Sequence, residues 1–235
     1  MSKTMGFVIS HKNGEKRRAL LPEDLGRINN VDSLYFETGY GESVYVSDEE
    51  YIKMGAHVVS REEALKCDII VDVKLGDADY LDQLEDGKIL VGWAHAVQGI
   101  NFTTACLNKN FTVIAWEEIF EHGQYIFYRN REVAGEAGVL QAFLYCGKMP
   151  YECKVAILGN GQTAKGAMRI LHGLGAQVDV YRPSGTSLRK GRLLGAPAEA
   201  WDSLFVEIGL AMTANTRETP SFGGGEFFLF YMHAW

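Results

Sequence analysis

Apolar and polar positions alternate along most of the chain in a pattern that predicts short strands separated by helices. The segments CDIIVDVK (67–74) and KILVGWAH (88–95) are nearly continuous apolar runs, which is typical of strands buried on both faces of a sheet. VSDEEYIKMG (46–55) has the polar and apolar spacing of a helix, with Ser47 as its N-cap and Gly55 at its end. This repeated β-α-β order predicts a parallel sheet covered by helices.

The second part of the chain begins with a longer helical pattern. EVAGEAGVLQAFLYCG (132–147) predicts one long helix suited to joining two α/β domains. Its apolar positions are Val133, Ala137, Leu140 and Leu144. The following segment, 154–181, predicts a strand, a helix and a second strand.

We therefore expect an α/β protein with two Rossmann-like parallel-sheet domains, the second of which is incomplete. Residues 1–130 would form a substrate-binding and catalytic α/β domain, and 131–181 a linker helix with the first half of a dinucleotide-binding domain. Residues 182–235 would be an atypical tail, a truncated or frameshifted remainder of that domain. Residues 182–209 show no clean strand, and we expect the further strands of that domain to be missing from the tail, whose end places three glycines beside the aromatic cluster FFLFY. A divergent end that still folds is the alternative.

A glycine-rich turn predicts dinucleotide binding. Gly159, Gly161 and Ala164 form a G-x-G-x-x-A pattern between a predicted strand and a predicted helix. The first glycine permits a tight turn, the second lets a pyrophosphate approach the backbone, and the alanine allows close helix–strand packing. Backbone N–H groups at the helix N-terminus favour phosphate binding there. A purely structural glycine turn is the alternative.

The residue that ends the second strand of this unit bears on the choice of cofactor. An acidic residue at this place binds the ribose of NAD, whereas VDVYRPS (178–184) has Arg182, whose guanidinium is able to pair with the 2′-phosphate of NADP. Ser184 and Thr186 offer additional hydroxyl donors. We therefore expect NADPH as the cofactor; the alternative is that Arg182 already belongs to the atypical tail.

Charge and composition argue against several other classes of protein. The formal net charge of −7 lies in residues 1–181, because the tail carries five basic and five acidic side chains. An acidic body is unsuited to nucleic acid. No apolar run reaches the roughly 18–20 residues of a membrane span, and the N-terminus lacks the pattern of a signal peptide. The four cysteines show no C-x-x-C spacing. We expect a cytoplasmic protein with no metal, nucleic acid or membrane partner.

Three chemically capable side chains follow predicted strands. Arg17 follows the first strand, Lys74 ends VDVK, and His95 ends KILVGWAH. Open α/β sheets bind ligands at the carboxyl ends of their strands. A lysine at a strand end is often simply solvated, and a histidine there is often a core residue. Three such groups from three strands together predict a binding site.

Five motifs then carry a resemblance to a known family. GFVISHKNGEKRRALLPEDL, VDVKLG, GWAHAVQG, NREVAGEAG and LGNGQTAKGA occur in this order over about three quarters of the chain. With them the chain resembles the alanine dehydrogenase and lysine-forming saccharopine dehydrogenase superfamily, and within it the N5-(carboxyethyl)ornithine synthases. The resemblance implies an NADPH-dependent oxidoreductase that condenses pyruvate with the side-chain amine of ornithine or lysine. It also implies a homo-oligomer.

The resemblance further implies roles for the strand-end residues. Arg17 would bind the carboxylate of the 2-oxo acid, Lys74 would polarise its carbonyl or contact its carboxylate, and His95 would be the general acid–base group. Alanine dehydrogenases commonly have Lys-Glu-Pro at the lysine, whereas this chain has Lys74-Leu75-Gly76. This departure speaks against a plain alanine dehydrogenase.

Two alternatives stay open at this point. An alanine or saccharopine-type dehydrogenase of the same superfamily would differ from the synthase in its amine donor. A catalytically inactive, truncated dinucleotide-binding homologue would bind the cofactor, or nothing, without turnover.

Overall fold

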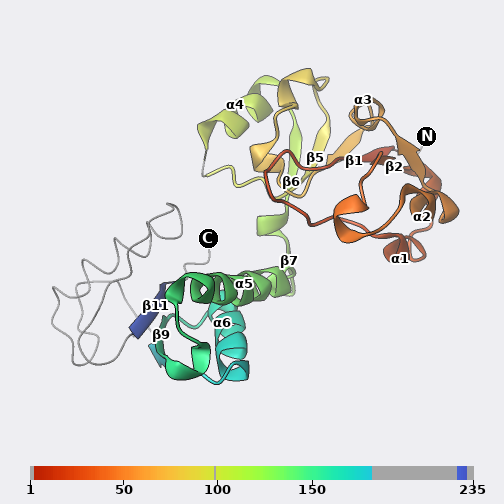
Figure 1. The fold of residues 1–235 in the computed structure, drawn as a ribbon. Coiled ribbons are helices and arrows are strands. Elements are labelled where there is room, and N and C mark those ends of the chain that lie inside the picture. Colours follow the sequence, from red (N-terminus) through yellow and green to blue (C-terminus); the bar gives the residue numbers. More distant parts are fainter. Residues whose placement is uncertain (1–2, 98, 182–226, 232–235) are drawn as a thin grey trace. The chain divides into compact units, whose positions relative to one another are not determined.

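The computed structural model describes residues 3–97, 99–181 and 227–231 (Figure 1). The chain divides into two compact units, Met1–Ile126 and Phe127–Trp235. Each unit has its own sheet and its own core.

Among the described residues of the first unit, six parallel strands form a sheet in the order β3-β2-β1-β4-β5-β6. The strand order reverses direction between β1 and β4, which is the switch point of a doubly wound sheet. The expected Rossmann-like α/β class is therefore confirmed. The strands are β1 (Met5–Phe7), β2 (Leu34–Glu37), β3 (His57–Val59), β4 (Ile69–Val71), β5 (Ile89–Gly92) and β6 (Thr112–Ala115).

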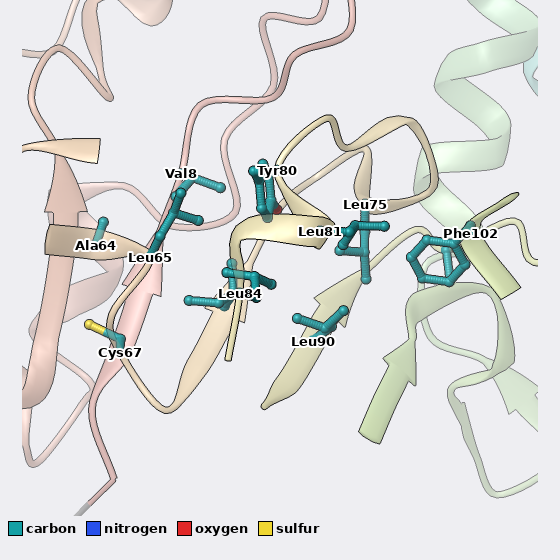
Figure 2. Packing of buried hydrophobic residues seen from close by; sticks show 12 residues of the cluster. Val8, Ala64, Leu65, Cys67, Leu75, Tyr80, Leu81, Leu84, Leu90 and Phe102 are labelled. Atoms are coloured by element: carbon teal, nitrogen blue, oxygen red, sulfur yellow. The ribbon is translucent and has the colours of Figure 1, made fainter. Parts of the chain in front are cut away.

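Side chains of this sheet enter two cores, because successive residues of a strand point to opposite faces. On β4, Ile70 belongs to one buried cluster and Val71 to the other. Figure 2 shows the first cluster, in which Leu75, Leu84 and Leu90 gather over the strands. Apolar material on both faces explains why these strands are continuous apolar runs rather than alternating ones.

Short helices connect the strands of the first unit, and their ends match the expected signals. Pro22 is the first residue of α1, and Ser47 is the N-cap of α2. The backbone N–H of Ser47 donates to the carboxylate of Glu50 at 3.0 Å, as in a capping box. The helices are α1 (Pro22–Leu25), α2 (Asp48–Lys53), α3 (Arg61–Ala64) and α4 (Ile100–Asn108), and a hairpin of β7 (Phe120–Glu121) and β8 (Gln124–Tyr125) follows them.

In the second unit, the described residues form two helices and a three-stranded parallel sheet in the order β10-β9-β11. The strand β9 lies between the two others, so the order again reverses at the strand that precedes the glycine-rich turn. The elements are α5 (Tyr128–Cys146), β9 (Lys154–Leu158), α6 (Gln162–Gly173), β10 (Gln177–Tyr181) and β11 (Phe227–Tyr231).

The strand β11 corrects the expectation that the further strands of this domain are missing from the tail. Residues 227–231 pair with β9 in parallel, with Phe227 opposite Lys154 and Tyr231 opposite Leu158. Five consecutive aromatic or apolar residues are typical of a strand in a parallel sheet.

The long helix is present, but it buries a different face from the one expected. Val133, Leu140 and Leu144 are 46%, 49% and 81% exposed, whereas Gly135 and Val139 are buried. A Cβ at Gly135 would overlap the carbonyl oxygen of Thr163 on α6. The two helices lie side by side in Figure 1, and small residues at their contact allow this close approach.

Candidate active site

The structure places Arg17, Lys74 and His95 beyond the carboxyl ends of β1, β4 and β5. These three strands are neighbours in the sheet, and the switch point lies between the first two of them. The charges of Arg17 and Lys74 both act on the imidazole of His95. The first unit therefore brings together the three residues that the strand ends predicted.

Arg17 is oriented by a carboxylate and an aromatic ring. Its Nε donates to Oε1 of Glu15 at 2.8 Å and its Nη2 donates to Oε2 at 2.5 Å. Its guanidinium carbon lies 4.8 Å from the centre of the Trp93 ring. Only 7% of the Glu15 side chain is exposed. Burial alone would raise the pKa of Glu15, but the hydrogen bonds from Arg17 bring it below its usual value.

Lys74 stands two residues after a buried carboxylate, that of Asp72. Its backbone N–H donates to Oδ1 of Asp72 at 2.8 Å, and the hydroxyl of Tyr80 donates to Oδ2 at 3.1 Å. Asp72 also has a hydrogen bond with the side chain of Ser10, which follows β1. Burial raises the pKa of Asp72 despite these bonds. This carboxyl group ties the segments after β1 and β4 together beneath the site.

His95 adopts an uncommon backbone conformation, with φ of 45°. The carboxylate of Glu117, which follows β6, accepts the backbone N–H of His95 at 2.5 Å and that of Ala94 at 3.1 Å. Burial lowers the pKa of His95, and the positive charges of Lys74 and Arg17 act in the same direction. The negative charge of Glu117 opposes this shift.

An ion pair and a hydrogen bond hold the beginning of the loop that carries Arg17. Nζ of Lys12 lies 3.0 Å from Oδ1 of Asp77, just beyond Lys74. The carboxylate of Glu37 accepts the backbone N–H of Ile9 at 2.7 Å. These contacts anchor the beginning of the loop to the neighbouring strand ends.

The glycine-rich turn of the second unit has the geometry expected for phosphate binding. Gly159 has φ of 113°, a conformation that residues with a side chain rarely adopt. Gly161 is the N-cap of α6, and among the described residues, chain neighbours aside, no atom lies within 4 Å of the place that its Cβ would occupy. Ala164 is buried and packs in the cluster that contains Val155 and Ile157. The turn thus leaves open backbone at a helix N-terminus, which fits a pyrophosphate.

A charged cluster joins α5 to α6 close to this turn. Glu132 accepts hydrogen bonds from Arg129 at 2.8 Å and from Arg169 at 2.9 Å. Arg169 also donates to Glu136 at 2.5 Å. The hydrogen bonds from Arg169 and Arg129 hold the pKa of Glu132 below its usual value. The cluster therefore holds α6, the helix that begins at the glycine-rich turn, against α5.

Arg182 and Ser184, the residues expected to select NADPH, lie outside the described residues, as does Thr186. Within the described ranges, no three histidine, cysteine, aspartate or glutamate side chains are grouped so as to hold a metal ion. The helices of the same ranges include none long and apolar enough to cross a membrane.

Comparison with known proteins identifies the family. The model of the family described as "Alanine dehydrogenase/PNT, N-terminal domain" matches residues 9–127, more than half of the chain. The chain belongs to this family, and the resemblance predicted from the motifs is confirmed.

Curated relatives define the resemblance more closely. An N(5)-(carboxyethyl)ornithine synthase of Clostridium botulinum (strain Hall) is 34% identical over 180 residues, which cover 69% of this chain and 56% of the relative. The protein of the same name from Lactococcus lactis (strain IL1403) is 33% identical, covering 75% of this chain and 62% of the relative. The matched region thus spans less than two thirds of these relatives.

A solved structure shows the same fold. An L-alanine dehydrogenase superposes with a TM-score of 0.61 at 20% identity, covering 97% of this chain and 61% of the other. At this level of identity the likeness concerns the fold alone.

Proposed function

We propose that this chain is an oxidoreductase that uses NADPH to reduce the imine formed from pyruvate and the side-chain amine of ornithine or lysine. The observation that carries the proposal is that Arg17, Lys74 and His95 follow three neighbouring strands, two of which flank the switch point of the first sheet, and that the charges of Lys74 and Arg17 act on His95. The names of the relatives supply the reaction, and the product would be an N-(1-carboxyethyl) amino acid.

The two units would bind different reactants. The first would hold the substrates, and the second would hold the dinucleotide at Gly159, Gly161 and Ala164. The open backbone at Gly161 supports this assignment. Arg182 and Ser184 would bind the 2′-phosphate. The nicotinamide supplies the hydride, and the protein supplies orientation and charge.

Arg17 and Lys74 would hold pyruvate for attack. Arg17, oriented by Glu15 and Trp93, would pair with the carboxylate of pyruvate. Lys74 would polarise the ketone and stabilise negative charge on its oxygen as the amine adds. The two cations also favour a neutral His95 beside them.

His95 would move the protons of the condensation. Because its pKa is lowered by burial, the imidazole is largely neutral near pH 7 and is able to accept a proton. A proton from solvent would convert the oxyanion that forms on addition into a hydroxyl. His95 would take one proton from the amine nitrogen and give it to this hydroxyl, which leaves as water. Reduction of the resulting carbon–nitrogen double bond then gives the secondary amine.

The test is a cofactor-oxidation assay with the purified chain, NADPH, pyruvate and either ornithine, lysine or ammonia. Oxidation that requires ornithine or lysine would support the proposal. Activity with ammonia alone would favour an alanine dehydrogenase instead. A folded chain that binds NADPH without oxidising it would indicate an inactive homologue. Repeating the assay with NADH tests the assignment of Arg182.

A further inference from the structure

The strand ladder between β5 and β6 stops just before the histidine. Its last pair is Gly92 with Ala115. Beyond it, the rings of Trp93 and Trp116 pack edge to face, with centroids 4.9 Å apart. The two segments therefore continue side by side after regular pairing has ended.

Beyond this last pair, the side chain of Glu117 supplies hydrogen-bond acceptors for the segment that follows β5. Its two carboxylate oxygens each accept one backbone N–H, Oε2 from Ala94 and Oε1 from His95. A backbone N–H in a part-buried position needs such a partner. The bond to His95 is short, at 2.5 Å.

The same bond supports an otherwise unfavourable backbone. At φ of 45°, His95 lies in the left-handed region, which costs a residue with a side chain free energy unless its surroundings hold it there. The backbone angle decides in which direction the imidazole leaves the chain. Loss of the carboxylate would let this turn relax and move the ring.

We propose that Glu117 is the positioning residue for His95: its carboxylate holds the left-handed turn and so places the imidazole at the carboxyl edge of the sheet. The proposal rests on the proposed acid–base role of His95 and deepens it. Glu117 acts through the backbone, and its contacts with Ala94 and His95 are to main-chain N–H groups.

Glu117 also contributes charge to the site. The ionisable groups that act on His95 are Glu117 and Asp77, which raise its pKa, and Lys74 and Arg17, which lower it. Removal of the Glu117 charge should therefore let His95 titrate at a lower pH than in the wild type. A residue that merely stabilised the fold would leave this titration unchanged.

Three variants separate position, charge and general stability. Glu117→Gln removes the charge and keeps only one acceptor oxygen. Glu117→Asp keeps the charge but is one methylene too short to serve both N–H groups. Glu118→Gln is the matched control, because this neighbouring glutamate is exposed.

The experiment combines NMR titration of the His95 imidazole and of the amides of Ala94 and His95 with steady-state kinetics on the full chain. For Glu117→Gln we expect a lower pH of titration, altered amide shifts, and a fall in kcat of about tenfold to hundredfold with KM for pyruvate nearly unchanged. Glu117→Asp keeps the charge, so His95 should titrate at a pH closer to that of the wild type than in Glu117→Gln, but kcat should still fall. Glu118→Gln should match the wild type.

Two outcomes would overturn the proposal. One is a folded Glu117→Gln chain with wild-type titration, wild-type amide shifts and wild-type kcat. The other is an equal loss in Glu118→Gln. The NMR measurements need no turnover, so they test the positioning role even if the wild type reduces no imine, an outcome that would count against the proposed function alone.

Discussion

Burial and positive charge keep the pKa of His95 low, and this has a consequence for stability. A histidine whose pKa is lower in the folded than in the unfolded chain binds more protons when unfolded. The free energy of unfolding therefore rises with pH between the folded pKa and about 6.5, and this contribution is complete above that value. As the pH falls from about 6.5 through the folded pKa of His95, this contribution to the free energy of unfolding is lost.

We expect this slope to disappear in His95→Gln. Urea unfolding of the wild type should show stability falling from about pH 7 to about pH 5 more steeply than in the variant. His172→Gln is the control, because this histidine is exposed on α6. Equal slopes for the wild type and His95→Gln would contradict the lowered pKa.

Arg17 offers a second test at the scale of a residue. In Arg17→Lys the charge remains but the planar fork that matches a carboxylate is lost, together with the stacking on Trp93. If Arg17 binds the carboxylate of pyruvate, KM for pyruvate should rise about tenfold to hundredfold, with a smaller effect on kcat. Arg27→Lys changes an exposed arginine in the same way and should leave KM unchanged.

At this scale, strand ends could be read from the sequence, but their partners could not. Lys74 and His95 end apolar runs, and Arg17 follows the first apolar run after a short polar segment, so their common edge was predictable. Glu117 also follows an apolar run, yet its role depends on β6 lying beside β5. Likewise, Asp72 reads as one polar residue within a strand until Tyr80 and Ser10 are seen around it.

Among the elements, the crossing of α5 and α6 makes the sharpest prediction. A Cβ on Gly166 would overlap the carbonyl oxygen of Glu132, which belongs to the backbone and has little room to move. Gly166→Ala should therefore lower the free energy of unfolding by about 1–3 kcal/mol, measured by urea denaturation. The matched control is Gly173→Ala, in the same helix, where the part of the chain that the structure describes places no atom from outside the helix's own nearby backbone within 4 Å of the new Cβ. It should be neutral or slightly stabilising.

The same crossing explains why the apolar pattern of α5 was misleading. Its stripe of Val133, Leu140 and Leu144 has helical spacing, and this spacing correctly predicted a helix. The buried face, however, contains Gly135 and Glu132, since close contact with α6 requires a small residue and the arginines of both helices hold the glutamate. Periodicity predicts the existence of a helix better than the face that it buries when glycines make the contact.

At the scale of the whole molecule, substitutions in the two units should impair different steps if each unit has the role proposed for it. A substitution in the first unit should lower kcat, and one in the second should weaken cofactor binding. Gly161→Ala should lower stability only slightly, by the modest cost of alanine at an N-cap, because its φ of −75° suits alanine and no described residue beyond its chain neighbours lies within 4 Å of the new Cβ. The added methyl group would nevertheless stand where a pyrophosphate approaches the backbone. We expect the Kd for NADPH, measured by fluorescence titration, to rise at least about tenfold.

His95→Gln should show the opposite behaviour, with an unchanged Kd for NADPH and a loss in kcat of about a hundredfold to ten-thousandfold. Gly173→Ala, at the far end of α6, should change neither quantity. Wild-type NADPH binding in Gly161→Ala would mean that the glycine turn serves only the fold. If each variant lost both NADPH binding and turnover, a general loss of stability would explain both effects. The assignment of the substrates to one unit and of the cofactor to the other would then have to be abandoned.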